Sequence, residues 1–95
     1  MKEIVLNRTF GGFRFGKKFC EHYHCSPYGY DFDTSMLDEE MRMDERLVEW
    51  VKQYPEDNPS LKVYVIPDDA TDWEINEYDG MESLTLVING KIVHR

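Results

Sequence analysis

The chain has 95 residues and a net charge of −8, and 41% of its residues are hydrophobic. That length is enough for one domain, which buries only about two-thirds of the surface that its unfolded chain exposes. The apolar content, with 14% aromatic residues, argues against global disorder despite 32% charged residues. No apolar run reaches the roughly 20 residues of a membrane helix, and the first residues indicate a strand rather than a signal peptide. We therefore expect a single domain, residues 1–95, that is soluble and cytoplasmic.

The charge is unevenly distributed along the chain. Residues 1–18 hold five basic side chains and one acidic side chain, whereas residues 19–82 hold 18 acidic and four basic side chains, a net charge of −14. An acidic surface argues against direct binding of nucleic acid phosphates and favours attraction to a basic partner. The alternative is that the carboxylates only keep a small protein in solution.

The N-terminal part predicts a strand, a turn and a short helix. Residues 2–7 alternate weakly and are typical of a strand, which we expect to join the C-terminal sheet. Gly11 and Gly12 permit a turn. Phe15, Phe19 and Tyr23 have the spacing of one helical face, which predicts a helix over residues 16–24, although no Ser, Thr, Asp or Asn precedes it as a cap.

Residues 44–53 predict a second helix. Leu47, Trp50, Val51 and Tyr54 recur at the spacing of an apolar helical stripe, and prolines follow at positions 55 and 59. A shorter helical segment is predicted through residues 37–40. We expect the stripe to pack on the sheet, with Trp50, Leu47 and Val51 covering these side chains: Val63, Val65 and Trp73 or Ile75.

Residues 61–95 predict an unbroken run of antiparallel strands. The pairs Asp79-Gly80 and Asn89-Gly90 each separate alternating segments, and such pairs suit hairpin turns in which both central residues need φ > 0. The predicted fold is therefore α+β, with an antiparallel sheet of about four to five strands, a C-terminal meander, and two short helices on one face.

The sequence matches parts of two ligand-binding motifs, but in each case residues that the ligand requires are replaced. Residues 11–18 match the phosphate-loop pattern G-x-x-x-x-G-K, but Lys18 stands where Ser or Thr would hold Mg²⁺, and two Phe and one Arg crowd the loop. The segment from Asp31 begins like a calcium loop, but Met36 and Arg42 replace the required Gly and Glu. No catalytic residues and no cofactor are predicted, and we expect the protein not to be an enzyme.

A metal site is the alternative interpretation. Cys20, His22, His24 and Cys25 lie within six residues, and Cys20 and His24 would share a helical face. A structural zinc site needs four ligands, and His94 is the one remaining His or Cys. Free thiols in a reducing compartment are the preferred interpretation, with no metal ligand assigned.

The predicted partner-binding residues lie in a loop with Gly and Pro, where tyrosines stand beside carboxylates. Tyr gives a large contact area at a small entropic cost, and carboxylates would meet Lys or Arg of a partner. The residues are Tyr28, Tyr30, Asp31, Asp33, Asp38, Glu39 and Glu40. The alternative is that these rings cover the core. A second acidic set lies on the hairpin: Asp68, Asp69, Asp72, Glu74, Glu77, Asp79 and Glu82.

The chain also resembles a known group of proteins. The pattern consists of an N-terminal strand, Gly11-Gly12-Phe13, the helix Arg42-x-Asp44-x-x-Leu47-Val48-x-x-Val51, then Ile66-Pro67-Asp68-Asp69 and Glu74-Ile75-x-Glu77-Tyr78-Asp79-Gly80-x-Glu82. It is similar to short, mostly uncharacterised proteins encoded by phages and prophages. The resemblance implies a protein that binds and inhibits a host nucleic-acid-handling or defence protein in the bacterial cytoplasm, as anti-CRISPR inhibitors do. It implies no catalytic residues.

Overall fold

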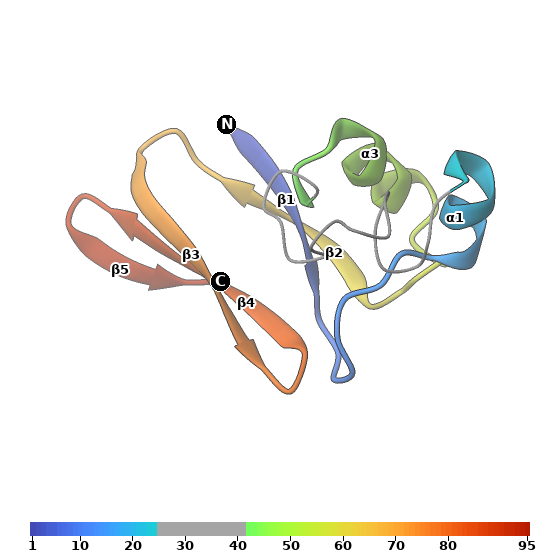
Figure 1. The fold of residues 1–95 in the computed structure, drawn as a ribbon. Coiled ribbons are helices and arrows are strands. Elements are labelled where there is room, and N and C mark those ends of the chain that lie inside the picture. The colour runs from blue at the N-terminus through green and yellow to red at the C-terminus, as the bar shows by residue number, and fades with distance from the viewer. Residues whose placement is uncertain (25–41) are drawn as a thin grey trace.

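The computed structural model describes residues 1–24 and 42–95, which form an α+β fold with two helices and two antiparallel sheets (Figure 1). The elements in chain order are β1 (Lys2–Asn7), α1 (Lys17–Tyr23), α3 (Glu45–Gln53), β2 (Leu61–Ile66), β3 (Ala70–Tyr78), β4 (Met81–Ile88) and β5 (Lys91–His94). The predicted fold class, the two short helices predicted over residues 16–24 and 44–53, and the C-terminal meander are confirmed. The short helical segment predicted through residues 37–40 lies outside the described residues. No helix in these described ranges is long and apolar enough to cross a membrane.

The strands form two sheets, and the prediction that β1 joins the meander is wrong. β1 pairs antiparallel with β2, with Val5 opposite Val63, and β3, β4 and β5 form a separate sheet in that order. Residues 67–69 end the pairing of β2 before β3 begins, so the meander starts at Ala70 rather than at Leu61. Pro67 lacks an N–H donor, which suits a break between the two sheets.

The β1–β2 ribbon lies between the helices and the meander (Figure 1). Alternate residues of β1 face opposite ways, so Val5 packs with the buried residues of α1 and α3, whereas Ile4 and Leu6 pack with Leu84 and Leu86 of the meander. Burial on both faces explains why the alternation of β1 is weak in the sequence. The ribbon therefore separates two apolar cores, one under the helices and one under the meander.

The helix α3 covers the ribbon rather than the meander, which corrects part of one predicted set of contacts. Val63 packs with Leu47 and Val51 as predicted. Leu47 and Val51 are buried as expected, but Trp73 and Ile75 pack in the other core. Val65 is 43% exposed. Trp50 is half-buried and its ring lies 5.7 Å from that of Phe19 in α1. An aromatic contact between the two helices replaces the expected contact with the meander.

The missing cap of α1 comes from a distant residue. Gly16 at the N-cap has no side chain to offer, and Asp57 accepts hydrogen bonds from the N–H groups of Lys18 and Phe19, both at 2.9 Å. The Asp57 carboxylate also accepts the Trp50 indole N–H at 3.1 Å. A Cβ at position 16 would lie 2.2 Å from this carboxylate. Asp57 therefore fixes α1 to the loop after α3.

Both predicted hairpin turns are confirmed. Asp79 and Gly80 have φ of 50° and 89°, and Asn89 and Gly90 have φ of 54° and 75°. These values fit the turn in which both central residues have φ > 0. The first turn also packs against the loop after β1, because a Cβ on Gly80 would lie 2.2 Å from the Gly12 nitrogen.

Candidate functional site

The seven residues predicted to bind a partner lie outside the described part of the structure. They are Tyr28, Tyr30, Asp31, Asp33, Asp38, Glu39 and Glu40, all between residues 25 and 41. Their role stays a prediction, and the candidate site has to be built from other residues.

The structure gives no support to the metal alternative. Helix α1 ends at Tyr23, and His24 follows in the left-handed conformation with φ of 52°, so Cys20 and His24 do not share a continuous helical face. Cys25 lies outside the described residues. Within residues 1–24 and 42–95, no three His, Cys, Asp or Glu side chains gather as a metal ion would require.

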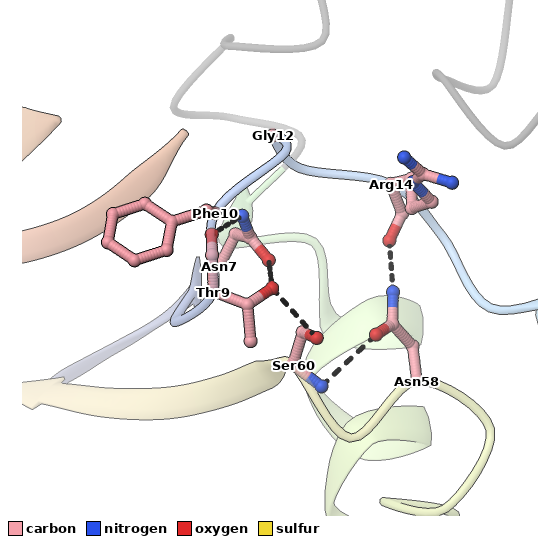
Figure 2. Close-up of a pocket in the computed structure, with 7 residues that line it drawn as sticks. All are labelled: Asn7, Thr9, Phe10, Gly12, Arg14, Asn58 and Ser60. Atoms are coloured by element: carbon pink, nitrogen blue, oxygen red, sulfur yellow. Dashed lines mark hydrogen bonds between the residues drawn. The ribbon is translucent and has the colours of Figure 1, made fainter. Parts of the chain in front are cut away.

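A surface pocket of about 210 Å³ lies between the loop after β1 and the segment before β2 (Figure 2). Its polar groups bond to one another: Thr9 Oγ1 donates to Ser60 Oγ at 3.0 Å, and Asn58 Nδ2 donates to the Arg14 carbonyl at 2.7 Å. Figure 2 shows the Arg14 guanidinium on the side away from Asn58. These hydrogen bonds connect the two loops. They leave few of the pocket's polar groups available to bond a ligand.

The residues 42 and 82 form a buried ion pair that the sequence analysis missed. Arg42 Nη2 lies 2.5 Å from Glu82 Oε2, and Nη1 lies 2.6 Å from Oε1, with both side chains almost fully buried. The prediction that Glu82 belongs to an exposed acidic set is therefore wrong. The alternation of β4 held the signal, because Glu82 shares its face with Leu84 and Leu86, which are buried.

This ion pair closes the free edge of β1. The Arg8 N–H donates to the Ser60 carbonyl, so alternate β1 residues bond to β2, while the backbone groups of Val5 and Asn7 point the other way. Glu82 Oε1 accepts the Asn7 N–H at 2.8 Å, and Arg42 Nη1 donates to the Val5 carbonyl at 3.3 Å. The pair therefore takes the place of a neighbouring strand, which is a structural role.

The exposed acidic surface lies on and beside β3. We use the term β3 carboxylates for five exposed side chains: Asp69, Asp72, Glu74, Glu77 and Asp79. Residues 63–90 contain no Lys or Arg, and among the described residues none of the five forms an ion pair. Asp68 differs, because it pairs with the amino group of Met1. The β3 carboxylates are therefore exposed side chains that no ion pair neutralises within the described part of the chain.

Two exposed aromatic rings lie at one end of this surface. Tyr78 is 70% exposed and Phe10 is 63% exposed, and their ring centroids are 6.3 Å apart in an edge-to-face arrangement. Tyr78 is the last residue of β3 and precedes Asp79. Large aromatic side chains with adjacent polar groups are enriched at protein interfaces. The acidic strand therefore ends in an aromatic pair that is open to contact.

Comparisons with protein-family models, with curated proteins and with solved structures found no match for this chain. The resemblance to phage-encoded proteins therefore stays a prediction. The function has to be argued from the charge and geometry of the described surface.

Proposed function

We propose that this protein is a non-enzymatic binding protein whose acidic surface binds a basic surface of another protein. The observation that carries this proposal is the set of β3 carboxylates, which are exposed, share one strand and its flanking turns, and have no basic residue between positions 63 and 90. Like charges that are not neutralised nearby add to a common field, which attracts an oppositely charged partner and raises its association rate.

The class of partner follows from the sign of the charge. A protein that binds nucleic acid presents Lys and Arg toward phosphates, and an acidic strand can compete for the same side chains. The resemblance to phage-encoded proteins supports a host nucleic-acid-handling or defence protein as the partner, with the bacterial cytoplasm as the place of action. On this proposal the chain inhibits that protein by occupying its basic groove, and it does not bind nucleic acid itself.

The aromatic pair supports a specific contact as well as general attraction. Charge steers the encounter, whereas buried aromatic side chains slow the dissociation of a complex. Phe10 and Tyr78 are exposed and adjacent to the β3 carboxylates. The predicted residues Tyr28 and Tyr30 would act in the same way if the loop lies at the interface.

The test is capture of the partner from bacterial lysate at low salt, followed by binding measurements with the purified partner. We expect affinity to fall steeply as salt rises, because surface attraction is screened over about 8–10 Å near physiological ionic strength. We also expect duplex DNA or RNA to displace the protein from its partner. A partner without a basic surface, or an affinity that does not change with salt, would contradict the proposal.

A matched pair of variants localises the contact. One variant neutralises four side chains on β3 and its turn: Asp72→Asn, Glu74→Gln, Glu77→Gln and Asp79→Asn. The control neutralises four exposed carboxylates on and beside the helices: Glu21→Gln, Glu45→Gln, Glu49→Gln and Glu56→Gln. The net charge is the same in both, so only a contact at β3 makes the first variant bind much more weakly than the second.

A further inference from the structure

β3 is an edge strand of the meander. It pairs with β4 on one side, and no strand in the described ranges pairs with it on the other side. Unpaired backbone N–H and C=O groups along such an edge can template the addition of another strand. Its nine residues make β3 the longest strand of the described fold, which leaves a long edge open.

The hydrogen bonds of β4 show which groups of β3 face this edge. The Leu84 carbonyl accepts the Arg95 N–H at 2.8 Å, so the backbone of Leu84 points toward β5. Ile75 is opposite Leu84 in the register. In such a pair the backbone groups of both residues point away from each other, so those of Ile75 point to the free edge. The same holds two residues away on each side, at Trp73 and Glu77.

One end of this edge is already closed by a side chain. Asp72 Oδ1 accepts the Trp73 N–H at 2.8 Å. No hydrogen bond from another described residue reaches the backbone of Ile75 or Glu77 across the free edge. These two alternate residues therefore present two donors and two acceptors, the pattern that an added strand needs.

Resting on the proposed function, we infer that β3 binds an extended basic segment of its partner as an additional β-strand along Ile75 and Glu77. Charge complementarity decides the occupant. Asp72 and Glu74 lie on the outer face of β3, opposite to the half-buried Trp73 and Ile75. An added strand with Lys or Arg at alternate positions places its charged side chains beside these two carboxylates.

The surroundings of the edge favour this occupant over a second copy of the same chain. Two β3 strands side by side would bring ten β3 carboxylates to one interface, and charges on edge strands oppose such pairing. A cavity of about 210 Å³, lined by Trp73, Ala70 and Pro67 among others, leaves room for a side chain at one end of the edge. Lys2 and Asp68 also line this cavity, and Asp68 pairs with the amino group of Met1, so charges of both signs lie at its rim.

The probe is a synthetic peptide of about seven residues that alternates arginine and valine, enough to span the edge. Its control has the same sequence with every internal peptide nitrogen methylated, so it keeps the charge but cannot donate backbone hydrogen bonds. We expect the parent peptide to bind about tenfold more tightly, because the methylated peptide cannot donate hydrogen bonds to the carbonyls of Ile75 and Glu77. Hydrogen exchange should slow at the amides of Ile75 and Glu77 and stay unchanged at Ile92 in β5.

Two variants at position 77 separate the effect of losing the backbone N–H at the edge from the effect of losing the carboxylate charge. Glu77→Pro and Glu77→Gln both remove the carboxylate, but only Pro removes the outward N–H and crowds the edge. We expect Glu77→Pro to bind the peptide about tenfold more weakly than Glu77→Gln, with both measured well below their denaturation midpoints. The midpoint of Glu77→Pro should be the lower one, because only Gln can still accept the Gly80 N–H that Glu77 Oε1 accepts at 2.7 Å. Equal binding of the two variants would overturn the inference.

The other outcomes distinguish this inference from the proposed function. If the methylated peptide binds as tightly as the parent, or neither peptide binds, strand addition is wrong, while salt-sensitive binding of the captured partner still supports the proposed function. If the free protein dimerises with slow exchange at Ile75, the occupant is a second copy and the inference is overturned. A captured partner that is insensitive to salt contradicts the proposed function, whatever the peptide does.

Discussion

Arg42 and Glu82 are 40 positions apart in the chain and form a bidentate ion pair that solvent scarcely reaches. The pair also bonds the backbone of β1 at Val5 and Asn7, and the Arg42 guanidinium lies 4.6 Å from the ring centroid of Phe13. It therefore joins β1, β4 and the segment before α3. Transfer of two charges out of water is unfavourable, so this pair depends on the hydrogen bonds between its two side chains and to β1.

We expect Glu82→Gln and Arg42→Met each to destabilise the protein by about 3–5 kcal/mol, because each leaves a buried charge without its partner. The double variant should lose less than the sum, but it leaves the Val5 carbonyl without its Arg42 donor, at about 1–3 kcal/mol. Urea denaturation of the four proteins measures the coupling. The exposed Glu49→Gln is the control and should change stability by less than about 0.5 kcal/mol. Additive losses would mean that the pair does not act as a unit.

Local signals in the sequence predicted local structure correctly, whereas long-range pairing was not predictable. The two turns and α3 follow from the residues that form them. The predicted helix began at Asp44, whereas Asp44 is the cap before α3, and its side chain accepts the Arg46 N–H at 2.8 Å. The cap of α1 depends on Asp57, and its position becomes known only once the chain is folded. The seven predicted site residues fall between residues 25 and 41, so the structure leaves that prediction open.

The Arg42–Glu82 pair is a second example of a long-range contact that the sequence did not predict. Net charge along the sequence assigned Glu82 to the acidic surface, and its inward position was visible only from strand alternation together with the register of β4. The pairing of β1 with β2 was likewise hidden, because burial on both faces removes the alternation that would identify a partner sheet. By contrast, the exposed β3 carboxylates were predictable, since their number and the absence of Lys and Arg are properties of the sequence itself.

The close contact between Gly16 and Asp57 predicts how substitutions at these two positions change the stability of the protein. We expect Asp57→Ala to lose about 1–2 kcal/mol, since α1 then has no cap. Gly16→Ala should also destabilise, because its Cβ would lie 2.2 Å from the Asp57 carboxylate. In the Asp57→Ala background the same Gly16→Ala change should be less destabilising, because the carboxylate that its Cβ would meet is gone. A double-mutant cycle by thermal or urea denaturation measures this coupling, and equal effects of Gly16→Ala in both backgrounds would contradict the contact.

The two hairpin glycines should respond differently to alanine. Gly80 and Gly90 both have positive φ, so each substitution strains the backbone by about 1 kcal/mol. A Cβ on Gly80 would also meet the Gly12 nitrogen at 2.2 Å, whereas nothing lies within 4 Å of a Cβ on Gly90. We expect Gly80→Ala to be more destabilising than Gly90→Ala by at least about 1 kcal/mol. Equal losses in a denaturation experiment would show that the turn and the loop after β1 do not pack closely.

The N-cap of α3 predicts a dependence of stability on pH. The side-chain hydrogen bond from Arg46 is the main cause that lowers the pKa of Asp44 below its ordinary value of 3.8, and partial burial opposes it. A lowered pKa in the folded state means that the charged form stabilises the fold above the ordinary value, and that this contribution is lost as pH falls through the folded pKa. The parent should therefore lose its advantage over Asp44→Asn between about pH 5 and pH 2. A constant difference between their free energies of unfolding over that range would contradict this role.

The last prediction concerns which acidic surface binds the partner. Reversing the five β3 carboxylates to Lys, or instead reversing Asp31, Asp33, Asp38, Glu39 and Glu40 to Lys, adds ten charges in either case and changes the net charge from −8 to +2. General attraction responds to net charge, so it would weaken equally in both variants. A specific contact responds to position, because only charges near the interface lose their opposite charges in the complex.

We expect the β3 reversal to abolish binding of the captured partner and the loop reversal to weaken it less, as surface plasmon resonance would measure. Tyr78→Ala should mainly raise the dissociation rate, because an aromatic anchor contributes after the encounter. Circular dichroism should be unchanged, since the reversed β3 side chains are exposed. If the loop reversal alone abolishes binding, the predicted loop residues form the site and β3 does not. If neither reversal weakens binding, the acidic surface serves solubility, and the proposed function is wrong.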